Sequence, residues 1–113
     1  MSGVAGIVRR SFDQPDETYP SDDGSMTRIV QVGDNFVMHS VMQPGWSWEQ
    51  YVKPMAQEDS CPMHHREYVM SGRIRYRMDD GTEMVAQAGD YLEIQPGHLA
   101  WVVGDERCVT IDW

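Results

Sequence analysis

The sequence is poor in basic residues and in cysteine, and it contains no long apolar run. Nine lysines and arginines stand against eighteen acidic residues, which gives a net charge of −9. Because the phosphate backbone of nucleic acids repels a chain of this charge, nucleic acid is not expected as a partner. No apolar run reaches the roughly 18 residues that span a membrane, and residues 1–10 lack the basic-then-apolar order of a secretory signal. A cytoplasmic protein without a membrane partner is therefore expected.

The two cysteines, Cys61 and Cys108, are too few for a disulfide framework. They are expected to be reduced thiols in a reducing compartment. With 113 residues, 41% of them hydrophobic, the chain is too apolar for a disordered protein and long enough for one core. The composition therefore predicts a single globular domain.

Alternation of polar and apolar residues dominates the second half of the chain. Residues 73–78 alternate arginine with apolar side chains, which predicts a strand with one exposed and one buried face. Asp80-Gly81 predicts a tight type I′ turn, because both residues tolerate positive φ, and residues 82–86 predict the return strand. Gly89-Asp90 and Pro96-Gly97 mark further turns beside strands at 91–95 and 100–103. Such spacing predicts an all-β sandwich or barrel of about 8 or more strands.

The first half of the chain divides into an arm and the start of the barrel. Residues 1–25 show no sustained period and are interpreted either as a flexible tail or as an extended segment laid over a sheet or a partner subunit, with Ile7, Val8, Phe12 and Tyr19 as anchors. Residues 26–113 are expected to form the barrel, beginning with strands at 28–32 and 36–42. The second of these strands is apolar on both sides, so both of its faces are expected to be covered.

The central residues resemble those of a small single-domain cupin, whose fold is a double-stranded β-helix or jelly-roll barrel. The resemblance covers residues 29–113 and is carried by segments such as GWSW, VKP, YVMSGR, MDDGTE, PGH and AWVVGDE. It implies an all-β jelly-roll cupin barrel with an extended N-terminal arm. The branch of small cupins that shares these segments implies a fold but no particular activity.

The metal motifs of the cupin family are altered in this sequence. When Gly72 is aligned with the glycine that closes the first motif, His65 stands at the family's glutamate, Cys61 at its second histidine and Asp59 at its first. In the second motif Gly89 and Gly97 match, but Ala100 replaces the histidine and Gly104 the asparagine. The resemblance therefore implies the barrel but not the usual ligand set.

A different ligand set follows from the alternation of side chains along strands. His98 is two residues before Ala100, and Cys61 and His65 are four apart, so each even offset keeps a side chain on the same face. A thiolate and two imidazoles suit zinc first, then iron, nickel or copper. The ordinary alternative is a buried cysteine and surface histidines. Cys61, His65 and His98 are the predicted metal ligands.

Other side chains are candidates for the same pocket. Glu67 shares the face of His65 and is predicted to be a fourth ligand or a general base, with a solvated residue at the barrel mouth as the alternative. His64 is offset by one and is expected to point outward. An aromatic wall around a small-molecule site is predicted, with core packing as the alternative. The predicted ligand-binding residues are four aromatic side chains and one histidine from the strand at 36–42, namely Trp46, Trp48, Tyr76, Trp101 and His39.

Two functions stay open at this point. One is a metal-dependent enzyme acting on a small organic molecule, of the lyase, isomerase, cyclase or dioxygenase class, with Glu67 moving protons. The other is a non-catalytic barrel that binds or senses a metabolite without metal. A homodimer is expected in either case, because small cupins commonly pair and because the acidic arm would cover the arginines at 73, 75 and 77 or a sheet edge.

Overall fold

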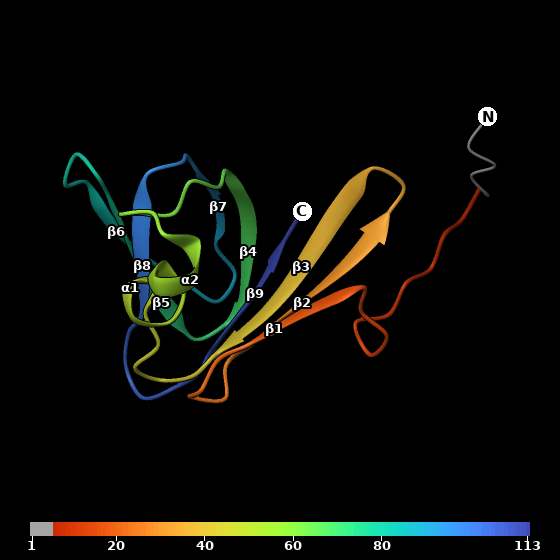
Figure 1. Cartoon of the computed structure of the whole chain (residues 1–113), viewed down its shortest axis with the longest axis horizontal. Coiled ribbons are helices and arrows are strands. Elements are labelled where there is room, and N and C mark those ends of the chain that lie inside the picture. Colours follow the sequence, from red (N-terminus) through yellow and green to blue (C-terminus); the bar gives the residue numbers. More distant parts are fainter. Residues whose placement is uncertain (1–5) are drawn as a thin grey trace.

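The computed structural model describes residues 6–113, which form nine strands in two antiparallel sheets (Figure 1). The larger sheet has the order β1-β2-β3-β9-β4-β7 and the smaller one the order β6-β5-β8. The strands are β1 (Glu17–Pro20), β2 (Met26–Val32), β3 (Asn35–Met42), β4 (His65–Ser71), β5 (Arg73–Met78), β6 (Glu83–Gln87), β7 (Tyr91–Ile94), β8 (His98–Val102) and β9 (Cys108–Asp112). The predicted all-β class is confirmed.

Helical structure is limited to one connection between β3 and β4. It contains α1 (Trp48–Tyr51) and α2 (Lys53–Ala56), so no helix in residues 6–113 exceeds four residues or could cross a membrane. The sequence analysis assigned no helix to this connection. Ser47 explains the difference, because its hydroxyl caps α1 by accepting from the Gln50 amide at 3.2 Å.

The core lies between the two sheets and draws on both of them. Alternation puts every second residue of β5, β8 and β9 inside, in the burial pattern that a half-exposed strand requires. The buried apolar cluster consists of Met42, Val69, Ile74, Tyr76, Ala86, Ile94, Ala100, Val102 and Cys108. The faces assigned to the residues of strand β5 from the sequence are therefore confirmed.

The predicted hairpin at 73–86 is confirmed, but its turn is of another type. Strands β5 and β6 pair from Arg73 with Gln87 to Arg77 with Glu83. Gly81 is the one residue of this turn with positive φ, at 93°, and its amide donates to the Met78 carbonyl at 2.9 Å. A type I′ turn needs positive φ at both central residues, so that prediction is wrong. The Asp80 side chain instead accepts from the Thr82 amide at 2.9 Å and holds a longer loop.

The hairpin of β2 and β3 extends past the rest of the larger sheet (Figure 1). Strand β9 pairs with β3 only from Met38 to Met42, which leaves the first residues of β3 without a second neighbour. Phe36 is consequently 55% exposed, and the prediction that β3 is covered on both faces is wrong for this end.

The predicted arm at 1–25 includes one regular element. Strand β1 pairs antiparallel with β2, from Glu17 opposite Ile29 to Pro20 opposite Met26. Of the predicted anchors, Phe12 packs on the ring of His39 at 5.3 Å between centroids, whereas Ile7, Val8 and Tyr19 are exposed. The first five residues of the arm lie outside the described part of the chain. The division into an arm at 1–25 and a barrel at 26–113 stays a prediction.

Candidate functional site

Backbone pairing places Cys61 directly opposite His98. The two residues form an isolated antiparallel bridge, in which the Cys61 amide donates to the His98 carbonyl and the Gly97 amide donates to the Cys61 carbonyl, both at 2.8 Å. Residues opposite each other in such a bridge present their side chains on one face. Both side chains are buried, with 5% and 2% of their surface exposed.

His65 completes a group of three with Cys61 and His98. It opens strand β4, where it pairs with Ile94 of β7. The Cys61 Sγ and His65 Nε2 atoms are 3.7 Å apart, and the two imidazole rings meet edge to face at 5.1 Å between centroids. One ligand atom from each of the three residues lies within 4.8 Å of the others. The structure thus brings the three predicted ligands together.

A hydrogen bond orients His98. Its Nδ1 donates to the Gln95 carbonyl at 2.8 Å, across the Pro96-Gly97 turn. In histidines that ligate metals, a carbonyl often holds the other ring nitrogen in this way. The hydrogen bond therefore fixes the orientation of the His98 ring.

Cys61 and His65 form a charge pair. Burial raises the pKa of the Cys61 thiol. The hydrogen bonds from His65 and His98 lower this pKa by more than burial raises it, so that the pKa of Cys61 is about 6. Burial lowers the pKa of His65, whereas Asp112 and Cys61 raise it to about 10. His65 Nδ1 lies 3.3 Å from the Asp112 carboxylate, at ion-pair distance but without hydrogen-bond alignment. At neutral pH the pair is consequently a thiolate beside an imidazolium.

Glu67 lies next to this pair, on the same face of β4. It is 4% exposed, and the buried Tyr76 hydroxyl donates to its Oε2 atom. Burial and the neighbouring Asp112 raise the pKa of Glu67 to about 7, against the lowering effect of the Tyr76 hydrogen bond. A carboxyl group with this pKa can gain or lose a proton at neutral pH, as a general acid or base must.

These polar groups form one end of a cavity of about 440 Å³ inside the barrel. This volume is in the range of small-molecule sites. Three of the aromatic residues that were predicted to surround a small-molecule site line this cavity, namely Trp46, Trp48 and Tyr76. The connection that carries α1 and α2 also contributes Tyr51, Val52 and Met55, so this connection covers part of the cavity.

Two of the predicted pocket residues lie elsewhere. Trp101 follows the inward Ala100 on β8 and therefore points out of the barrel, where its ring lies 6.0 Å from the Arg75 guanidinium and 5.9 Å from that of Arg77. His39 alternates with Met38 and Ser40, both of which line the cavity, so it packs on Phe12 at the opposite face. Neither residue reaches the polar cluster.

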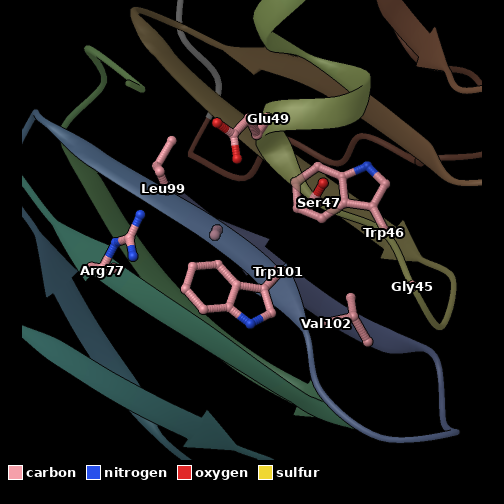
Figure 2. A pocket seen from close by; sticks show the side chains of 9 residues that line it. Gly45, Trp46, Ser47, Glu49, Arg77, Leu99, Trp101 and Val102 are labelled. Carbon is pink, nitrogen blue, oxygen red and sulfur yellow. The ribbon is translucent and has the colours of Figure 1, made fainter. Parts of the chain in front are cut away.

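Trp101 belongs to a second hollow of about 420 Å³ on the outer face of the smaller sheet (Figure 2). Trp46 and Ser47 lie on one side of it and Arg77 and Leu99 on the other, with Glu49 above. His65, His98 and Glu67 do not line it. The buried polar groups His65, His98 and Glu67 therefore lie in the inner cavity and not in this hollow.

Asp112 was missed by sequence reasoning, although a signal was present. Cys108, Thr110 and Asp112 alternate on β9 and all point inward, with Thr110 and Asp112 lining the cavity. The even spacing from the buried Cys108 could have revealed it. Asp59, at the position of the family's first histidine, is exposed, and His64 is exposed with its Nε2 3.0 Å from Glu93.

Comparisons with known proteins identify the fold. No family model matches the sequence, and no curated protein matches it either. Among solved structures, a Klebsiella pneumoniae protein with a double-stranded β-helix domain is similar at 21% identity and a TM-score of 0.59, covering 96% of this chain and 88% of its own.

Two further structures are described as cupins. A cupin-like protein from Thermotoga maritima is 20% identical with a TM-score of 0.54, covering 96% of this chain and 79% of its own. A cupin-2 domain protein from Shewanella frigidimarina is 16% identical with a TM-score of 0.52, covering 77% and 78%. At these identities the likeness concerns the fold alone, and it agrees with the two-sheet barrel described above. The chain is therefore a small cupin-fold protein with a Cys61, His65 and His98 group inside its barrel.

Proposed function

We propose that this protein is a metal-dependent enzyme that acts on a small organic molecule inside the barrel. The observation that carries the proposal is the convergence of one thiol and two imidazoles within 4.8 Å at the polar end of a cavity of about 440 Å³. Three protein ligands with a remaining open position are typical of catalytic zinc sites.

The distances and the donor types fit a divalent ion. Bonds of about 2.3 Å to sulfur and 2.0–2.1 Å to nitrogen put neighbouring tetrahedral ligands roughly 3.5 Å apart. The distance of 3.7 Å between Cys61 Sγ and His65 Nε2 is near this value. A thiolate with two imidazoles favours zinc first, then iron, nickel or copper.

The chain's own residues would handle protons in this site. A bound divalent ion would supply Lewis-acid or oxygen-activating chemistry at the three ligands. Glu67 is the catalytic residue of the proposal, because its raised pKa of about 7 lets it accept a proton from a substrate and return it. The Tyr76 hydroxyl orients Glu67 by donating to its Oε2 atom.

Elemental analysis tests the proposal. Protein purified without a metal-chelating tag is expected to contain about one divalent ion per chain, and a chelator should lower its melting temperature because the ion binds the folded state. If the protein contains no stoichiometric metal, and zinc, iron, nickel and copper all leave the melting temperature unchanged, the enzyme proposal fails.

The pH dependence of zinc affinity also tests the proposal, because the pKa values of the ligands predict its direction. Metal binding requires that the Cys61 thiol and the His65 imidazolium each lose a proton. Between pH 6 and 10 the Cys61 thiol is ionised while His65 is protonated, so binding should release about one proton and tighten roughly tenfold per pH unit. Below about pH 6 the thiolate also takes up a proton, and affinity should fall more steeply. Calorimetric titration in buffers of different ionisation enthalpy measures the released proton.

A non-catalytic metabolite-binding or sensing protein is the second candidate. It is favoured by the raised pKa of His65, because the protonated imidazole and the Cys61 thiolate balance each other without a metal. Ligand binding by protein that contains no metal would support this function. The cytoplasmic location expected from the sequence stays a prediction for both candidates.

A homodimer is also proposed. It is supported by exposed apolar side chains on the larger sheet and the C-terminus, namely Tyr68, Met70, Tyr91 and Trp113, which are 40–56% exposed. Patches of this kind on a small protein often mark an interface. Light scattering should give twice the chain mass of 13.0 kDa at micromolar concentration, and a species of 13.0 kDa would contradict the dimer.

A further inference from the structure

The inner cavity has two chemically different ends. The polar end carries seven groups, which are Cys61, His65, Glu67, Tyr76, His98, Thr110 and Asp112. The remainder of the wall is mainly methionine, aliphatic and aromatic. A ligand that fills the whole cavity therefore needs an apolar body and one polar group.

The polar end does not attract anions. Glu67 and Asp112 are both buried there, at 4% and 6% exposure, and no arginine or lysine in the described part of the chain lines the cavity. The His65 ring is already engaged on both sides, by Cys61 Sγ at 3.7 Å and by the Asp112 carboxyl group at 3.3 Å. A phosphate or a polycarboxylate would thus be desolvated without an arginine or a lysine to compensate its charge.

The apolar wall is built mainly from flexible side chains. Five of the nine methionines line the cavity, and these are Met26, Met38, Met42, Met55 and Met63. Methionine has no branch and adapts its shape to irregular apolar partners. At the mouth Met55 is 69% exposed, Tyr19 51% and Met63 47%, so apolar surface continues to the solvent. An apolar ligand body would cover it.

We propose that the cavity takes a small apolar molecule carrying a single neutral or cationic polar group, and that it rejects phosphates and polycarboxylates. The polar group would lie among Glu67, Tyr76 and Asp112, and the apolar body would pack on the methionines that line the cavity. This inference rests on the proposed function in that it assigns a ligand class to the same cavity, with or without a bound ion.

Three probes that share one apolar body test the class: phenylpropylamine, phenylpropanol and phenylpropyl phosphate. Binding can be followed by the fluorescence of Trp46 and Trp48 and by the shift in melting temperature. The amine and the alcohol are expected to bind at least about tenfold more tightly than the phosphate. This order should hold both for protein as purified and after treatment with a chelator.

Substitutions of cavity residues test whether the probes bind in the inner cavity. Met63→Ala should weaken the amine and the alcohol roughly 3- to 10-fold, whereas Met70→Ala should leave both unchanged. The two methionines are matched in exposure, at 47% and 50%, but only Met63 lines the cavity. Asp112→Asn should reduce the ratio of amine affinity to phosphate affinity, since it removes one buried carboxyl group from the cavity wall.

The outcomes separate this inference from the metal proposal. Equal or tighter binding of the phosphate, an equal effect of the two methionine variants, or no binding of any probe would overturn the ligand class. The metal content of the same samples is measured independently. Protein that contains no metal as purified and is not stabilised by zinc, iron, nickel or copper, but still prefers the amine and the alcohol, would refute the metal-dependent enzyme and leave the ligand class standing.

Discussion

Replacing Cys61 with serine is expected to weaken zinc binding by about 100-fold or more. The thiol of Cys61 has a pKa of about 6 and is therefore a ready thiolate ligand at neutral pH, whereas a serine hydroxyl stays protonated. A 100-fold loss corresponds to about 2.7 kcal/mol of binding free energy. Competition with a chromophoric chelator measures it, and the stabilisation of the protein by zinc should fall in parallel.

Cys108→Ser is the matched control for this variant. Cys108 is also buried, with 0% of its surface exposed, but it belongs to the apolar core, and burial raises the pKa of its thiol to about 12. The control is expected to cost some stability, because a hydroxyl enters an apolar site, while the zinc affinity should stay unchanged. Equal zinc affinity in both variants and the parent protein would show that Cys61 is not a ligand.

Gly72→Ala is expected to destabilise the fold by about 2–5 kcal/mol. Gly72 joins β4 to β5 with a φ of 77°, a conformation that costs other residues about 1–2 kcal/mol. A Cβ atom there would also lie 2.7 Å from the Cys108 Cα atom and closer still to the Arg107 carbonyl oxygen. Backbone cannot rotate away as a side chain can, so overpacking adds roughly 1–3 kcal/mol. Urea denaturation measures the free energy of unfolding.

Gly81→Ala separates the two contributions. Gly81 has a similar φ of 93°, but nothing lies within 4 Å of the place where its Cβ would be. Only the conformational cost of about 1–2 kcal/mol is therefore expected. Losses of equal size at the two glycines would contradict the close approach of β9 to Gly72.

The resemblance to cupins was informative about the barrel because it depends on local signals. The hairpin of β5 and β6 follows from alternation and from Gly81, which are both readable in the chain. Its turn type was not predictable in the same way, because the choice depended on the Asp80 side chain accepting from the Thr82 amide. The helices after Trp46 were missed, since single turns of helix have no period long enough to detect.

At the candidate site, too, some features were predictable from the sequence and others were not. Even spacing correctly placed Cys61, His65, Glu67 and His98 on inward faces, whether or not they hold a metal. The prediction for Trp101 relied on residue type, which suggested a pocket, whereas the alternation after the inward Ala100 directs the indole outward. Asp112 was not considered, although its presence beside His65 changes the charge of the whole group.

The sequence by itself determined the class of the fold, the strand faces and the types of ligand atom available. These properties depend on the period of two along a strand and on chemistry that each residue carries with it. Only the tertiary structure decided which inward residues meet, because Cys61 and His98 are brought together by a backbone bridge between segments 37 residues apart in numbering. The pKa values of Cys61, His65 and Glu67 were likewise decided there, since burial and neighbouring charge exist only after the sheets close.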